Sequence, residues 1–496
     1  MLESSTATLV DEKLGLLQNY QTEAFFDEMM LPEGNCRSCS LELMNQLDRM
    51  GMEELKRRQH SADRAFMTMG ITFNVYKSGM GVEKIFPFDV IPRIVPAEDW
   101  EQIETGLKQR VQALNLFIDD IYHRQQILRD GVIPREVVES SKGFLKECIG
   151  INPPKGIWCH INGPDLIRHS DGSFYVLEDN LRVPSGVSYV LGNRRIMKSS
   201  FSNEFQRLGV RSIHDYPHKL KKMLQYLSDQ PEPVVAVLTP GIYNSAYFEH
   251  SSLANEMGVQ LVEGSDLVVN DQGVCMRTIS GLKKIDVIYR RLDDQFIDPT
   301  VFRPESLLGV PGLFTAWAKG QVALANALGT GIADDKVVYA YVPSMIRYYL
   351  DQEAILPNVP TFLCWDEKQR QHVLENLDSM VVKPANESGG YGMLVGPKAS
   401  KKEIEEFRHL IASSPRNYVA QPTMSLSRVP TVVQDRLEGR HVDLRPFVLH
   451  GEDTYVIPGG LTRVALTKGS LVVNSSQGGG SKDTWVLQKP TGDAPC

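Results

Sequence analysis

The spacing of apolar residues changes along the chain and predicts where helices and strands lie. Apolar residues recur at the period of an amphipathic helix in 41–58 and again from 97 to 121. In 70–88 apolar and polar residues alternate on either side of a glycine-rich turn, which is typical of strands. The N-terminal region, residues 1–150, is therefore predicted to be mixed and largely helical.

A different pattern starts after residues 228–234, a polar stretch with two prolines that is typical of a linker. The apolar run 234–238 predicts a buried strand, a helical stretch follows through Leu253, and a second strand-like run follows at 258–264. This order is the β-α-β opening of a doubly wound lobe. A dinucleotide site would need GxGxxG at the first turn, where only Gly241 is present, so we expect neither a nicotinamide nor a flavin cofactor.

Two arginines follow the next predicted strand, 285–289. Arg290 and Arg291 lie at its carboxyl end, which is the edge where open α/β sheets bind ligands. One hypothesis is a bidentate clamp for an acidic substrate. The other is a structural ion pair with Asp293 or Asp294. The residues alone leave both open.

The clearest turn signal is the dipeptide Asp171-Gly172, which strand-like runs flank on both sides. Aspartate followed by glycine is typical of a two-residue hairpin turn. With this dipeptide at the centre of the turn, Ile167 faces Val176 and Asp165 faces Glu178. Paired residues hold their Cβ atoms about 4.5–5.5 Å apart, so the two carboxylates would repel each other unless a positive charge lay between them.

Asn180 adds an amide oxygen to this pair of carboxylates. It lies two residues after Glu178, so both side chains leave the same face of the sheet. Together Asp165, Glu178 and Asn180 suit Mg²⁺ bound with phosphates. Arg182 follows two residues later, and on the same face it would meet a phosphate or a substrate carboxylate. A solvent-facing acidic hairpin with a surface arginine is the alternative.

The segment 380–395 has the composition of a phosphate-binding loop. A β-branched strand leads to Lys383, the glycines Gly389, Gly390 and Gly392 follow, and a second strand returns. Glycines let backbone N–H groups approach phosphates, and a lysine neutralises their charge. The Walker pattern GxxxxGK[ST] is absent. A plain glycine-rich hairpin is the alternative.

Arginines recur on strand-like segments near the end of the chain. Arg445 lies in an Asp-Leu-Arg segment, and Arg463 lies in the next apolar run. An arginine in a strand needs an anionic partner or water, so two of them near an acidic site indicate a phosphate between them. Asn474 belongs to a glycine-rich stretch, 472–483, which either lines an acceptor pocket or forms a flexible tail.

These motifs resemble those of the ATP-grasp ligases. Asp165, the pair Glu178-x-Asn180 beside a hairpin and the following Pro-Ser-Gly are similar to the metal-binding end of that family, which includes glutathione synthetases and D-alanine–D-alanine ligases. In those enzymes the hairpin closes the domain, whereas here it precedes the lysine and glycine segments. That order resembles the circularly permuted ATP-grasp family over most of residues 65–485.

The resemblance implies an α+β fold, a circularly permuted ATP-grasp fold with a doubly wound α/β pre-ATP-grasp lobe and a mixed N-terminal extension. It divides the chain into five parts. They are 1–150, the N-terminal region; 151–230, the permuted part with the metal-binding hairpin; 231–330, the α/β lobe; 331–425, the lid subdomain with the glycine loop; and 426–496, the core strands and tail.

The resemblance also implies roles for individual residues. Lys336 and Lys383 would contact ATP, Gln421 would lie at the hinge that receives adenine, and Arg445 and Arg463 would face the transferred phosphoryl group. The predicted site has four groups of residues. They are the catalytic arginines Arg445 and Arg463; the nucleotide-binding residues Lys336, Lys383, Gly389, Gly390, Gly392 and Gln421; the metal ligands Asp165, Glu178 and Asn180; and the substrate-binding residues Arg182, Arg290, Arg291 and Asn474.

We therefore expect an ATP- and Mg²⁺-dependent carboxylate–amine ligase, with Mn²⁺ as the alternative metal. Such a site moves the γ-phosphoryl group of ATP to a carboxylate, and an amine then attacks the acyl phosphate while a closed lid excludes water. The substrates would be a small-molecule or peptide carboxylate and an amine. A phosphotransferase on the same fold and a nucleotide-binding partner protein with little chemistry of its own are the alternatives.

Composition narrows the classes of function. A net charge of −8 without a basic stripe argues against a nucleic-acid binder. No apolar run reaches membrane length and no leader opens the chain, so we expect no membrane partner and a cytoplasmic location, with a homo-oligomer left open. Seven scattered cysteines do not form a disulfide framework. For the lone CxxC at Cys36 and Cys39, zinc or redox chemistry and reduced thiols are the alternatives.

Overall fold

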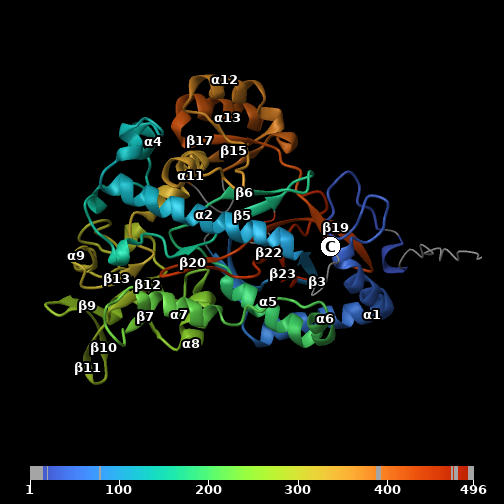
Figure 1. Cartoon of the computed structure of the whole chain (residues 1–496), viewed down its shortest axis with the longest axis horizontal. Helices are drawn as coiled ribbons and strands as arrows, with labels where there is room; N and C mark the ends of the chain where they lie inside the picture. The colour runs from blue at the N-terminus through green and yellow to red at the C-terminus, as the bar shows by residue number, and fades with distance from the viewer. Residues whose placement is uncertain are drawn as a thin grey trace, which may run out of the picture.

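The computed structural model describes residues 15–18, 20–77, 80–386, 392–470, 473 and 479–489. Its largest sheet has the order β3-β23-β22-β19-β5-β6, with β18 paired to β19, and so joins segments that lie far apart in the chain. The long helix α2 crosses this sheet (Figure 1), and its apolar face shares one buried cluster with Leu166 and Val176. The bounds are β3 Phe88–Val95, α2 Ala97–Tyr122, β5 Asp165–Arg168, β6 Phe174–Glu178, β18 Arg428–Val433, β19 Arg436–Arg445, β22 Leu461–Val464 and β23 Gly480–Val486.

The α/β lobe is built on a parallel sheet of order β13-β12-β7-β8. The predicted strand at 234–238 is confirmed as β7, and the predicted strand at 285–289 is β12, which ends one residue later. A small sheet, β11-β10-β9, projects from the lobe (Figure 1). The bounds are α7 Tyr216–Tyr226, β7 Val235–Leu238, α8 Tyr247–Met257, β8 Gln260–Val262, β9 Leu267–Asn270, β10 Gly273–Thr278, β11 Gly281–Lys284, β12 Val287–Arg290 and β13 Ala323–Ala325.

The segment predicted to form the lid contains a small antiparallel sheet, β14-β17-β15-β16, beside the helices α12 and α13 at the top of Figure 1. The predicted strand leading to Lys383 and the returning strand are confirmed as β15 and β16. Ser400 and Glu403 form a capping box at the start of α13, which fixes where that helix begins. The bounds are β14 Phe362–Leu363, α12 Glu367–Glu375, β15 Met380–Pro384, β16 Leu394–Val395, α13 Lys401–Ser413 and β17 Tyr418–Pro422.

The N-terminal region contains the predicted helices and strands with longer bounds. The helix predicted at 41–58 is part of α1, which spans Ser38–Thr68 and is interrupted at Gly51, where φ is 73°. A left-handed residue cannot continue a right-handed helix, so α1 consists of two helical segments. The strands β1 and β2 follow it (Thr72–Lys77 and Met80–Ile85).

The hairpin of β5 and β6, predicted to bind a metal, has a different turn from the predicted one, yet one predicted pair is correct. The His169 amide donates to the Ser173 carbonyl at 2.9 Å, so the loop has three residues and ends on Gly172 with φ of 82°. Ile167 therefore pairs with Tyr175 instead of Val176. A register shift between Asp165 and Leu166 compensates, and Asp165 still faces Glu178.

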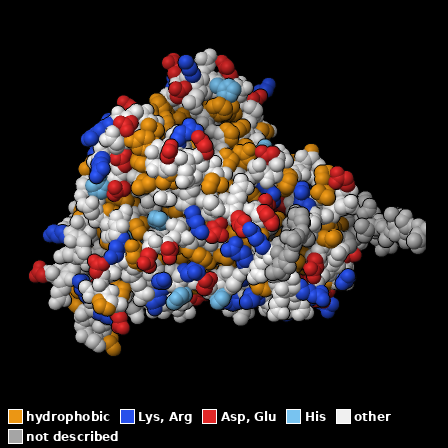
Figure 2. All heavy atoms as spheres, viewed as in Figure 1, with side chains coloured by type: hydrophobic (Ala, Val, Ile, Leu, Met, Phe, Trp, Pro, Cys, Tyr) orange, Lys and Arg blue, Asp and Glu red, His pale blue; other side chains and the backbone are white. Residues whose placement is uncertain are grey.

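Shorter elements connect these parts. They are α3 Gln126–Arg129, α4 Arg135–Glu139, β4 Ile161–Asn162, α5 Val187–Ser200, α6 Ser202–Arg207, α9 Leu313–Ala318, α10 Lys336–Tyr339, α11 Val342–Leu350, β20 Val448–His450 and β21 Thr454–Val456. Among the described residues, no helix has the length and apolar character that crossing a membrane requires. The described cysteines Cys36, Cys148, Cys159, Cys275 and Cys364 form no disulfide bond. Charged side chains of both signs are mixed over the face shown in Figure 2.

Candidate active site

Three charged residues form a row across neighbouring strands of the central sheet. Glu178 on β6 faces Asp165 on β5. Leu166 pairs with Leu444 of β19, so the antiparallel register brings Arg445 opposite Asp165 on the other side. The central sheet thus places two carboxylates and one guanidinium group side by side.

Asp165 is held by two arginines. Its Oδ1 accepts from Arg445 Nε at 2.5 Å, and its Oδ2 accepts from Arg445 Nη2 at 2.8 Å and from Arg463 Nη2 at 2.7 Å. Asp443 holds Arg463 from the other side, with Nε at 2.9 Å from Oδ1. Although burial opposes ionisation, the two guanidinium groups keep the pKa of Asp165 well below its ordinary value. Asp165 is thus a permanently charged, buried partner of both predicted catalytic arginines.

The two predicted ATP lysines meet the acidic hairpin. Asp335 caps α10 by accepting from the Val337 amide at 2.9 Å, and the Lys336 amide donates to the Ala385 carbonyl at 2.9 Å, just after β15. The Lys336 Nζ lies 3.5 Å from Glu178 Oε2. The start of α10 is therefore joined both to the lid strand and to the hairpin.

Lys383 lies on β15, an inner strand of this four-stranded sheet, close enough to interact electrostatically with Glu178 and Lys336. Burial lowers its pKa to about 8; the carboxylates of Glu178 and Asp165 favour the charged form, whereas Lys336 opposes it. We call Lys336, Lys383 and Glu178 the lysine–glutamate cluster. Two lysines beside one carboxylate are the kind of group that can bind phosphates.

Of the other predicted site residues, Asn180 and Gln421 make side-chain hydrogen bonds within the chain. Asn180 donates its amide nitrogen to the Gly163 carbonyl at 3.1 Å. Gln421 is buried on β17 and donates to Thr361 Oγ1 at 3.0 Å. Gly392 has a φ of 65°, a conformation that favours glycine. Three predicted residues, Gly389, Gly390 and Asn474, lie outside the described residues.

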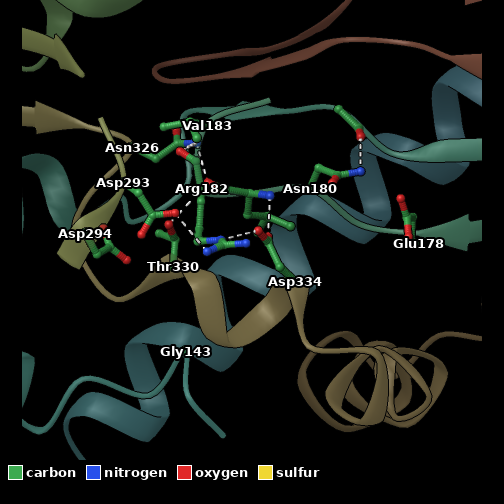
Figure 3. A network of polar contacts seen from close by, with 12 residues as sticks. Gly143, Glu178, Asn180, Arg182, Val183, Asp293, Asp294, Asn326, Thr330 and Asp334 are labelled. Atoms are coloured by element: carbon green, nitrogen blue, oxygen red, sulfur yellow. Dashed lines mark hydrogen bonds and ion pairs between the residues drawn. The ribbon is translucent and has the colours of Figure 1, made fainter. Parts of the chain in front are cut away.

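Arg182 turns away from the lysine–glutamate cluster into a network with two aspartates (Figure 3). Its Nε donates to Asp334 at 2.7 Å and its Nη1 to Asp293 at 2.9 Å, on opposite sides of the guanidinium group. These charges raise the pKa of Arg182 above its ordinary value. A side chain at Gly331 would bring its Cβ to 2.6 Å from Arg182 Cδ, so glycine is needed there.

A cavity of about 190 Å³ opens beside Arg182. Asp294 pairs with Arg290 at 2.7 Å and Asp335 with Arg416 at 2.8 Å, whereas Asp293 and Asp334 share Arg182. Four carboxylates among the described lining residues thus pair with three guanidinium groups. Lys142 also lines the cavity. Further lining residues are Gly143, Leu145, Gln295, Gly331 and Asn386. Sequence reasoning missed Asp334 and Asp335 as site residues; their place directly before Lys336 was the available signal.

Arg290 is used within the fold. It is fully buried, and its nitrogens donate to the carbonyls of Asn326, Leu292 and Ala327 at 2.6–3.0 Å. Its remaining partner is Asp294. Of the two hypotheses for this residue, the structure shows the ion pair.

Arg291 also binds within the chain. Its Nη1 donates to the Pro184 carbonyl at 2.7 Å, and its Nη2 donates to Ser185 Oγ at 2.5 Å and Glu249 Oε1 at 3.0 Å. The other Glu249 oxygen accepts from the Gly186 and Ser188 amides, at the start of α5. We call this the lobe arginine network. It fastens the Pro-Ser-Gly turn after the hairpin to the α/β lobe.

The oxygen ligands present fit a magnesium ion in part. Glu178 has a partly exposed carboxylate, and Asn180 has a side-chain oxygen that remains after its nitrogen binds Gly163. Mg²⁺ is usually bound by one or two carboxylates together with substrate phosphates and water. Within the described ranges, no three His, Cys, Asp or Glu side chains form a metal-binding group. A metal here would therefore depend on phosphate oxygens as well.

The family model for circularly permuted ATP-grasp type 2 matches residues 92–465, most of the chain. The chain belongs to this family. An uncharacterized protein of Synechocystis sp. is 58% identical to this ATP-grasp chain over 96% of it and 99% of that protein. An uncharacterized protein of Mycobacterium tuberculosis is 50% identical over 93% of the chain and 84% of its own length. The predicted family and α+β permuted fold are thus confirmed.

Two further relatives carry more specific names. A protein of Frankia casuarinae, named as a candidate glutamate–cysteine ligase 2-2, is 42% identical over 96% of this ATP-grasp chain but only 55% of its own length. Among solved structures, a glutathione synthetase-like effector of Globodera pallida matches 87% of this chain and 96% of its own, with a TM-score of 0.57 and 12% identity. At that identity the likeness concerns the fold alone. Family membership places the protein among the ATP-dependent carbon–nitrogen ligases of the ATP-grasp type.

Proposed function

We propose that the protein is an ATP- and Mg²⁺-dependent carboxylate–amine ligase that acts through an acyl phosphate. The observation that carries this proposal is the contact between a predicted ATP lysine and the acidic hairpin, which lie far apart in the chain: Lys336 Nζ is 3.5 Å from Glu178 Oε2, and Lys383 is close enough to interact electrostatically with both. Cations for phosphates and a carboxylate for a metal in one place are what phosphoryl transfer from ATP requires.

Each residue then has a definite part. Lys336 and Lys383 bind the phosphates of ATP, and Glu178 and Asn180 hold Mg²⁺ (or Mn²⁺) together with those phosphates. The bound metal would neutralise charge on the phosphate oxygens. Arg445 and Arg463, 16% and 8% exposed, lie at the edge of this group and stabilise the transferred phosphoryl group.

The cavity beside Arg182 is the proposed acceptor pocket. Its lining includes Asp335 and Asn386, the chain neighbours of Lys336 and Ala385, whose backbones are hydrogen-bonded to each other, so the cavity lies near the start of α10. The excess carboxylate favours an ammonium group, and Lys142 favours a carboxylate on the same molecule. An amino acid or peptide amine satisfies both. The name of the Frankia relative, a ligase of two amino acids, supports this class, although the chain spans 55% of that protein.

A turnover assay tests the proposal. Protein, ATP, Mg²⁺ and pools of carboxylic acids and amines are mixed, and ADP and phosphate are measured. ADP plus phosphate that forms only when both an acid and an amine are present supports a ligase. A stable phosphorylated product would instead indicate a phosphotransferase, and ATP binding without turnover would indicate a nucleotide-binding partner protein. We expect Glu178→Ala to abolish turnover; unchanged turnover would contradict the metal assignment.

A further inference from the structure

Asp165 and Glu178 face each other across two strands but differ in what binds them. Three guanidinium hydrogen bonds engage both oxygens of Asp165, whose side chain is 2% exposed. Glu178 is 19% exposed, and its contact among the described residues is Lys336 at 3.5 Å. A carboxylate offers about four lone-pair sites, so Asp165 has little capacity left, whereas Glu178 has most of its own.

The sheet explains the difference. Asp165 lies on β5 between β6 and β19, so Arg445 is its cross-strand neighbour, and Arg463 reaches it from β22. Arg463 is itself opposite Asp443 in the register of β19 and β22. Two carboxylates and two guanidinium groups thus form a closed, neutral chain. A divalent ion bound directly to Asp165 would have only the one lone-pair site left on Oδ1 and would lie next to two positive charges.

We propose that Asp165 is a positioning residue for Arg445 and Arg463, and that the metal is bound by Glu178 and Asn180 without it. This inference rests on the proposed function. Asp165 fixes the direction of both guanidinium groups, which then act on the transferred phosphoryl group. Its loss should damage the chemical step while leaving the metal in place.

The test separates metal binding from turnover. Mn²⁺ is titrated into protein with saturating ATP and followed by electron paramagnetic resonance, for the wild type, Asp165→Asn and Glu178→Gln. Asp271→Asn, an exposed turn residue, is the matched control for losing one negative charge. We expect Glu178→Gln to weaken Mn²⁺ binding by at least about tenfold. Asp165→Asn should weaken it by at most about fivefold, the effect of losing a neighbouring charge.

Turnover supplies the second measurement. We expect Asp165→Asn to lower kcat for ADP formation by at least about a hundredfold. Its effect should not add to that of Arg445→Gln, because both changes disrupt the same pair. An Asp165→Asn protein that loses Mn²⁺ as strongly as Glu178→Gln, or effects that multiply, would overturn the assignment.

Arg445→Gln keeps the inference testable if Asp165→Asn does not fold. This variant releases one guanidinium from Asp165, and we expect the Kd for Mn²⁺ to stay within about fivefold of the wild type. Binding more than about tenfold tighter would show that the freed Asp165 coordinates the metal and would overturn the inference. If the wild type itself does not bind Mn²⁺ with ATP, the proposed function fails as well, so the two failures can be told apart.

Discussion

The lobe arginine network and the lysine–glutamate cluster both place cations next to a glutamate, but they differ in how the charges are bound. In the network, Arg291 and Glu249 are almost fully buried, and four hydrogen bonds to backbone atoms and Ser185 surround their ion pair. In the cluster, Glu178 is partly exposed, and its described partner is a lysine at 3.5 Å. Buried charges that make most of their bonds within the fold hold it together, whereas a partly exposed carboxylate with one long ion pair can also bind a ligand.

The largest expected effect concerns the network. Arg291→Ala leaves Glu249 buried without its cation, so we expect the free energy of unfolding to fall by about 3–5 kcal/mol in urea denaturation. Arg195→Ala is the matched control, because Arg195 pairs with Glu256 at the surface and is 61% exposed. That variant should lose less than about 1 kcal/mol. Equal losses in the two proteins would contradict the distinction between network and surface pairs.

An intermediate effect concerns the cluster and pH. The pKa of Lys383 is about 8, below its ordinary value, so this lysine is protonated below pH 8 and loses its charge as the pH rises. ATP affinity, measured by calorimetry between pH 7 and 9.5, should therefore fall above pH 8 by up to about tenfold per pH unit. Lys383→Arg stays charged and should flatten the profile; Lys368→Arg on α12 is the control. A wild-type affinity independent of pH would refute the assignment of Lys383.

The smallest effect concerns the proposed acceptor pocket. Its Asp293 is one-third exposed and shares Arg182 with Asp334, so its charge is less fully paired than that of Glu249 in the lobe arginine network. Asp293→Asn should raise KM for the amine about threefold to tenfold with little change in KM for ATP, because one charge-assisted contact is lost. Asp271→Asn, on the projecting sheet, should change neither. A change in KM for ATP alone would move Asp293 to the nucleotide site.

Local patterns predicted most of the elements but not which charges are saturated. The helical period from 97 to 121 and the strand leading to Lys383 are confirmed, because side-chain periodicity follows directly from backbone geometry. Arg290 ends the strand β12 and Lys383 lies on the strand β15, yet the carbonyls of Asn326 and Ala327 accept hydrogen bonds from Arg290. Those carbonyls belong to a later segment, so the residues near Arg290 in the sequence could not predict these hydrogen bonds.

The sequence by itself determined the family and the order of the motifs, since these depend on residue types and spacings, whereas Asp165 faces Glu178 as predicted only because a register shift offsets the longer turn. Only the tertiary structure decided that Asp165 would bind Arg445 and Arg463, which lie 280 and 298 residues further along the chain. Strand neighbours of that separation are set by how the whole sheet assembles. The same assembly left Glu178 open beside two lysines, and a residue's partners, more than its type, govern what it can bind.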